Sequence, residues 1–254
     1  MKRLKLGVHA PEASAIAVAF LITALILFLL TLSVKEEKAL KPPSPKRITS
    51  EITLSGGEMW VVHFGGYDTE AEARIAGARY VRRGAGGCVI EKDGVFYAAG
   101  NLYENKEEAK RAEEKLKEEG LSSGLMGVSA EDAVLKVTAE EEKIRFLKEG
   151  YDAYTAAEKS LMSLSNRLDA GKASLSEALL VISVIRFDMK VMEEAKEEMG
   201  DGAVPGKIRL LFSDALSGIQ ALLQETGGEM LLSARVKCTA ICMRNRRFEF
   251  LNAL

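Results

Sequence analysis

Cysteine and histidine are the side chains of this chain that could bind a metal or do redox chemistry, and both are scarce. The 254 residues include three cysteines and two histidines. Cys238 and Cys242 are four residues apart and would share one face of a helix, whereas Cys88 is distant in the sequence. An odd number of cysteines does not indicate a disulfide framework. We interpret the cysteines as small core side chains, and we predict no metal site and no cofactor.

The sequence shows none of the common motifs of an enzyme active site. Residues Gly84–Gly87 are rich in glycine, but they lack the Lys-Ser/Thr pair of a phosphate-binding loop and follow a predicted helix. Acidic side chains come in runs, at 140–142 and 193–198, which is typical of solvated helix faces. We therefore predict that the protein is not an enzyme.

Composition excludes one class of partner. Apolar residues make up 47% of the chain and charged residues 28%, which is compatible with a folded core and a polar surface. The formal net charge is −2, so the chain has no general excess of positive charge for binding phosphates. We predict that it does not bind nucleic acid.

Residues 13–34 form a run of 22 residues without a charged side chain. A helix of this length matches the thickness of a bilayer core, which is roughly 30 Å. A cleaved signal peptide would have a shorter apolar stretch and a better cleavage site than Thr31-Leu32-Ser33. We predict a transmembrane helix that remains attached to the chain.

Basic residues flank this predicted anchor on both sides, so their count does not decide its orientation. A large region behind an early anchor is usually translocated. We therefore expect a single-pass membrane protein, with residues 1–12 in the cytoplasm and the rest outside. Residues 35–56, with three prolines, are predicted to be a linker.

Residues 58–93 and 94–128 form an internal repeat. At an offset of 36 residues, Tyr67 matches Tyr103 and Gly84 matches Gly120. Each half has a short apolar run, a glycine, an aromatic residue, a helical stretch that ends in glycine, and a further short strand. The predicted order is strand, helix, strand, strand, helix, strand. We expect a four-stranded antiparallel sheet over 57–135, with two helices on one face and the other face open.

The two halves resemble the SPOR (sporulation-related repeat) domain, a peptidoglycan-binding module of bacterial envelope proteins. The first copy reads Trp-Val-Val-His-Phe-Gly-Gly-Tyr over 60–67, and the second reads Val-Phe-Tyr-Ala-Ala-Gly-Asn-Leu-Tyr over 95–103. The resemblance implies binding of peptidoglycan glycan strands on the open sheet face. It places the following residues in or beside the ligand site: His63, Gly65, Tyr67, Phe96, Ala98 and Asn101.

Residues 138–254 show long helical periods. Apolar residues recur at spacings of three and four over 139–168, and Ser174 with Glu177 forms a capping-box pattern at the start of a second helix that runs to about Met199. Two further helices are predicted from Pro205 and over 229–250. The expected fold class is therefore α+β: a transmembrane helix, a small sheet domain and an antiparallel four-helix bundle. Basic residues near the end of the last helix either complement its dipole or contact an anionic lipid or wall polymer.

These patterns favour a membrane-anchored protein that binds cell-wall glycan at the septum during division or sporulation. One departure from the family supports an alternative: the third strand has Ala98 and Ala99 where SPOR domains often have polar side chains. In the alternative, the protein is an envelope scaffold that has lost glycan binding. Its helical region would then contact a protein partner or a second copy of the chain.

Overall fold

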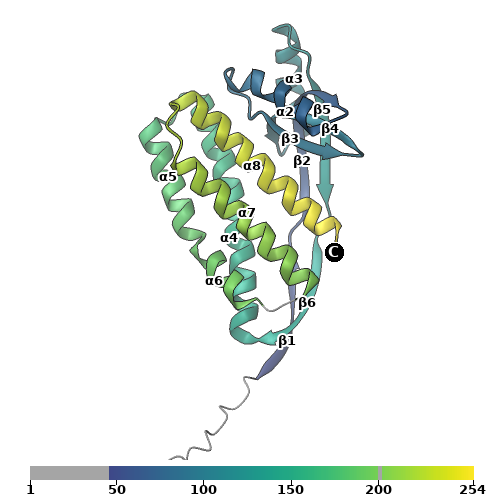
Figure 1. The fold of residues 1–254 in the computed structure, drawn as a ribbon, viewed down its shortest axis with the longest axis vertical. Coiled ribbons are helices and arrows are strands. Elements are labelled where there is room, and N and C mark those ends of the chain that lie inside the picture. The colour runs from purple at the N-terminus through teal and green to yellow at the C-terminus, as the bar shows by residue number, and fades with distance from the viewer. Residues whose placement is uncertain (1–45, 200–201) are drawn as a thin grey trace, which may run out of the picture. The chain divides into compact units, whose positions relative to one another are not determined.

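The computed structural model describes residues 46–199 and 202–254 (Figure 1). The predicted cytoplasmic tail, the predicted anchor at 13–34 and the first part of the predicted linker lie outside these residues. Within the described ranges, no helix combines the length and apolar character that a membrane crossing needs.

Four strands form the larger sheet. They are β2 (Gly57–Tyr67), β3 (Cys88–Lys92), β4 (Val95–Tyr103) and β5 (Gly124–Ala130), in the order β3-β4-β2-β5. Each neighbouring pair is antiparallel. Helix α2 (Glu70–Val81) follows β2, and helix α3 (Lys106–Glu118) follows β4. This order brings the two halves of the repeat together at the central strands β2 and β4.

The repeat determines where these two helices begin and end. The side chains of Thr69 and Asn105, which are 36 residues apart, accept hydrogen bonds from backbone N–H groups in the first turn of α2 and α3. Gly84 and Gly120 follow the two helices with φ angles of 85° and 79°. A residue with a Cβ is disfavoured at such angles, so both glycines suit the reversal that ends each helix.

A second sheet of two strands extends this part of the molecule. Strand β1 (Arg47–Leu54) pairs with β6 (Ala133–Glu140), and the pairing continues that of β2 with β5 across a short junction. At the junction, the Gly56 N–H donates to Asp132 Oδ1 at 2.8 Å. The end of the predicted linker is thus a paired strand, because Ile52 and Leu54 alternate with polar residues and bury their side chains.

Five helices follow the sheets. They are α4 (Glu141–Asp169), α5 (Leu175–Asp188), α6 (Lys190–Glu198), α7 (Ala203–Leu223) and α8 (Glu229–Asn252). The capping box at Ser174 and Glu177 begins α5. The single helix expected from Ser174 to Met199 is divided at Met189, which ends α5 and precedes α6 with a fully buried side chain.

The predicted fold class is wrong in its overall architecture. Helix α8 packs against β3, β4 and β5, so neither face of the sheet is open (Figure 1). One continuous apolar core includes Val61 of the sheet, Ile241 of α8 and Leu161 of α4. The molecule therefore has no division into a sheet domain and a separate four-helix bundle, and residues 46–254 form one unit. The physical reason is that both faces of the central strands are apolar, so both must be covered.

Candidate functional site

Three of the six residues predicted to bind glycan lie on the side of the sheet that faces α2 and α3, or at its corner. Ala98 is fully buried in a cluster with Phe64 and Ala76. Asn101 donates from Nδ2 to the hydroxyl of Tyr103 at 3.1 Å, and its Oδ1 accepts from the Leu102 N–H at 2.9 Å. Tyr67 packs against the same cluster as Ala98, and its hydroxyl donates to the Phe64 carbonyl oxygen at 3.3 Å.

His63 points to the opposite side of the sheet. Strand alternation places it on the same face as Met59 and Val61, and its ring meets that of Tyr97 edge to face, with centroids 4.8 Å apart. Its Nδ1 accepts from the Gly65 N–H at 3.3 Å. Burial lowers the pKa of His63, and Glu113 only partly opposes this effect. The imidazole is therefore a neutral, half-buried ring that is already hydrogen-bonded.

The two remaining residues lie elsewhere. Gly65 has a φ of 127° and lies in an irregular part of the pairing between β2 and β4. Phe96 is half-buried and lines a crevice at the β3 edge together with Glu91. The structure thus distributes the six residues over both faces and one edge, and it does not bring them together on one surface.

Helix α8 occupies the sheet face on which the resemblance places the ligand. Ile241 and Phe248 of this helix are 0% and 1% exposed, in the same core as Met59 and Val61 of β2. The backbones come close at Gly86, where a Cβ would lie 3.2 Å from the backbone nitrogen of Cys238. The face is a packed protein interface.

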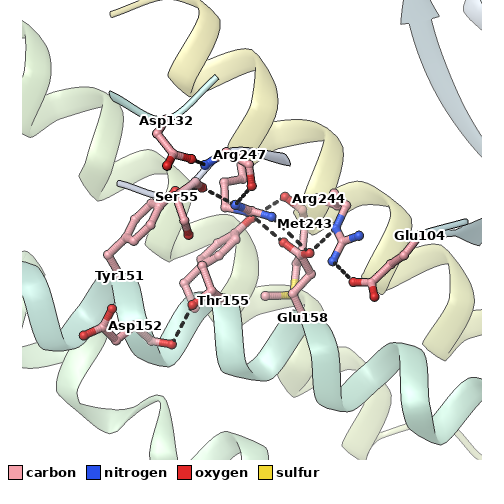
Figure 2. A network of polar contacts seen from close by, with 12 residues as sticks. Ser55, Glu104, Asp132, Tyr151, Asp152, Thr155, Glu158, Met243, Arg244 and Arg247 are labelled. Carbon is pink, nitrogen blue, oxygen red and sulfur yellow. Dashed lines mark hydrogen bonds and ion pairs between the residues drawn. The ribbon is translucent and has the colours of Figure 1, made fainter. Parts of the chain in front are cut away.

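A buried network of polar side chains joins α8 to α4 (Figure 2). Glu158 of α4 is fully buried and pairs with Arg244 and Arg247 of α8. Its Oε2 accepts from Arg247 Nε at 2.9 Å. Arg244 also donates from Nη2 to Glu104 Oε1 at 2.9 Å, which connects the loop between β4 and α3. Two arginines and two glutamates therefore balance each other in charge.

The same network reaches the junction between β1 and β2. Arg247 Nη1 donates to the carbonyl oxygens of Ser55 and Gly56, and Tyr151 Oη donates to that of Ser55 at 2.9 Å (Figure 2). Burial alone would lower the pKa of Arg247, but Glu158 and Tyr151 together raise it, so the guanidinium stays charged. We interpret the network as a structural connection between both sheets and the helices, since its groups bond to one another.

The basic end of α8 therefore has a different role from either expected one. Arg244 and Arg247 are 3% and 4% exposed and belong to the buried network. Arg246 is exposed and pairs with Glu249 of the same helix at 3.1 Å. Helical periodicity could have shown that Arg244 and Arg247 lie on one face of α8 and Arg246 on another. Only the packing of α4 against α8 identifies Glu158 as the common partner of Arg244 and Arg247.

The three cysteines, which are separated in the sequence, lie together in the structure. Cys88 begins β3, and its side chain faces Cys238 and Cys242 of α8, with all three sulfur atoms within 4.8 Å of one another. Cys88 is buried, Cys238 is half-buried and Cys242 is exposed. The spacing of Cys238 and Cys242 was visible in the sequence, but the position of Cys88 depends on the packing of α8 against the sheet.

The three thiols differ in pKa because each is affected by the other two. Hydrogen bonds from Cys238 and Cys88 lower the pKa of Cys242 well below its usual range, and Arg246 and Arg74 act in the same direction. Hydrogen bonding raises the pKa of Cys88, and that of Cys238 to about 12. The neighbouring thiols thus favour loss of the proton from Cys242 over loss from Cys88 or Cys238.

Comparison with known proteins gives no relative for this chain: no family model, no curated protein and no solved structure matches it.

Proposed function

We propose that this protein is a non-enzymatic scaffold of the bacterial cell envelope, attached to the membrane through residues 13–34, that works through protein contacts rather than through glycan binding. The observation that carries this proposal is the position of α8 on the sheet face. A glycan strand would need that face free, and α8 is part of the core there.

Displacement of α8 by a ligand would be costly. It would expose large apolar side chains such as Met59, Ile241 and Phe248, each of which is almost fully buried. Exposing one such side chain costs about 1.5–3 kcal/mol. It would also separate Arg244 and Arg247 from Glu158. These costs favour a sheet face that stays closed.

The contact surface that we assign to the scaffold is a stripe on α5, formed by Leu180, Val184 and Phe187. Their side chains are 65%, 53% and 76% exposed, and spacings of four and three residues place them on one face of the helix. Scattered exposed apolar residues are normal on a protein surface, but three in a row on one helix indicate a contact.

We assign this stripe to a second copy of the chain. In an antiparallel pair of α5 helices, Val184 would meet its own copy at the twofold axis and Phe187 would meet Leu180, so the stripe is complementary to itself. Glu177 lies near one end of the stripe and Lys190 near the other, so an antiparallel pair also brings opposite charges together. Three side chains per copy make a small interface, and attachment to one membrane would raise the effective concentration of the partners.

Glycan binding is tested with the purified full-length chain in detergent, incubated with intact peptidoglycan and with peptide-stripped glycan. We expect no more sedimentation with either polymer than with none, whereas a glycan-binding SPOR protein in the same detergent should sediment with the stripped glycan. Sedimentation of this chain that is lost on His63→Ala would overturn the proposal.

Pairing through α5 is tested by introducing a cysteine at Val184 and oxidising membranes that contain the full-length chain. Since two copies of residue 184 would meet at the axis, we expect a disulfide-linked dimer on a non-reducing gel. Lys148→Cys, at an exposed position on α4, is the matched control and should give no more disulfide-linked dimer than the wild type. Adding Phe187→Ser should abolish the dimer. Equal dimer yields from both cysteine variants, or a cross-link to a different protein only, would contradict pairing between copies.

A further inference from the structure

We infer that Cys88, Cys238 and Cys242 form a binding site for one thiophilic metal ion, either Zn²⁺ or Cu⁺, held by three sulfur ligands. This site is independent of the scaffold function proposed above. It rests on the convergence of all three cysteines of the chain at one point between β3 and α8.

The spacing of the sulfur atoms fits a single ion. A metal–sulfur bond is about 2.3 Å long, so three sulfurs around one ion are roughly 3.8–4.0 Å apart in tetrahedral or trigonal geometry. All three sulfur atoms already lie within 4.8 Å of one another. Small side-chain rotations can therefore close the site without movement of the backbone.

The scaffold around the sulfurs is rigid. Cys238 and Cys242 occupy successive turns of one face of α8, and Cys88 is fixed by the pairing of β3 with β4, where it lies opposite Ala99. The backbone of Gly86 lies so close to α8 that a Cβ there would be 3.2 Å from the backbone nitrogen of Cys238, which limits the space between helix and strand. Preorganised ligands of this kind lose little conformational freedom when they bind an ion.

The kind of donor selects the kind of ion. Within the described ranges, no carboxylate or imidazole joins the three sulfurs as a fourth ligand. Thiolates prefer soft ions such as Cu⁺ and Zn²⁺ over Mg²⁺ or Ca²⁺. Three sulfurs complete a trigonal site for Cu⁺, and they leave one position open for water on Zn²⁺.

A crevice gives an ion access to Cys242, the outermost of the three cysteines. It has a volume of about 190 Å³, lies at the β3 edge, and reaches Cys242 from the surface. The carboxylates of Glu70, Glu91 and Glu249 line it together with the guanidinium of Arg246. Once the thiols release their protons, the charges of Arg74 and Arg246 nearby offset part of the negative charge of the complex.

The experiment uses the full-length chain, purified in detergent under reducing conditions and freed of metal with a chelator. Zn²⁺ and Cu⁺ are added in separate arms, the samples are desalted, and bound metal is measured by mass spectrometry. A third arm with Co²⁺ reports sulfur ligation through its charge-transfer absorption. We expect one equivalent of Zn²⁺ or Cu⁺ per chain, and the arm with the tighter binding identifies the ion.

Variants assign the ligands. Three single variants should each weaken metal binding at least tenfold: Cys88→Ala, Cys238→Ala and Cys242→Ala. The triple variant should lack the charge-transfer band in the arm with Co²⁺. Thr239→Ala, which lies on α8 between two of the cysteines, is the matched control and should bind like the wild type. Circular dichroism establishes whether each variant is folded. Metal should also raise the unfolding midpoint of the wild type but not that of the triple variant.

Three results would overturn the site. The first is a folded, fully reduced wild type that retains neither ion. The second is binding that the triple variant keeps. The third is a stable disulfide between Cys88 and a cysteine of α8 in the chain isolated without reductant, because the same sulfurs would then be used as a cross-link.

Discussion

At the scale of single residues, Glu158 has the most consequential environment in the described structure. Its carboxylate is fully buried and pairs with both Arg244 and Arg247. Arg247 in turn donates to the carbonyl oxygens of the β1–β2 junction. A buried ion pair is not itself a large source of stability, because both charges lose their hydration. Loss of one partner, however, leaves the other charges buried without compensation.

Glu158→Gln should therefore be strongly destabilising. We expect a loss of roughly 3–5 kcal/mol in the free energy of unfolding, because two buried guanidinium groups lose their shared counter-charge. Urea unfolding followed by circular dichroism measures this change. Glu142→Gln is the control, since it removes an exposed pair with Arg145 and should cost less than about 1 kcal/mol. Similar losses for both variants would show that the network does not join α4 to α8.

At the scale of elements, α8 and α5 are both rich in apolar residues but have opposite environments. Helix α8 is buried on most of its surface, from Leu232 near its start to Leu251 near its end. Helix α5 buries Ala178, Ile182 and Ile185, and it exposes the stripe that we assign to a second copy. Composition alone does not distinguish the two, because an exposed apolar stripe and a buried one have the same sequence pattern.

Two phenylalanines test this difference. Phe248→Ala on α8 should destabilise the protein by about 3–5 kcal/mol, since it leaves a cavity between α8 and the sheet. Phe187→Ala on α5 removes a side chain that is 76% exposed and should change stability by less than about 0.5 kcal/mol. Both are measured by urea unfolding at low protein concentration, where pairing between copies is weak. A cost below about 1 kcal/mol for Phe248→Ala would mean that α8 is not part of the core.

At the scale of the whole molecule, the continuous core makes the sheets and helices a single cooperative unit. Residues of β1, β2, α4, α7 and α8 belong to one apolar cluster. A second, smaller cluster around Phe64 lies between the sheet and α2. A sheet domain that was separate from a bundle would have two cores and could unfold in two steps.

Unfolding should therefore be a single transition. Trp60 of β2 is the only tryptophan in the chain, so its fluorescence reports the sheet. Far-UV circular dichroism is dominated by the long helices. We expect both signals to change at the same urea concentration, as two-state unfolding requires. A fluorescence midpoint that is clearly lower than the circular dichroism midpoint would show that the sheet unfolds separately.

The sequence by itself determined the features that depend on neighbouring residues. The repeat offset of 36 placed Gly84 and Gly120, the glycines that follow α2 and α3. The capping box at Ser174 and Glu177 placed the start of α5. Such features are readable because a cap or a turn involves side chains and backbone groups within a few residues.

Only the tertiary structure decided how the parts meet. It paired β1 with β6, covered the sheet with α8, buried Ala98 under α2, and brought Cys88 to the cysteines of α8. Each of these contacts joins segments that are distant in the chain. Local pattern gives the apolar face of an element but not the partner that covers it, because burial of apolar surface is favourable with any complementary face. The glycan site was predicted on an apolar sheet face that the fold uses as core.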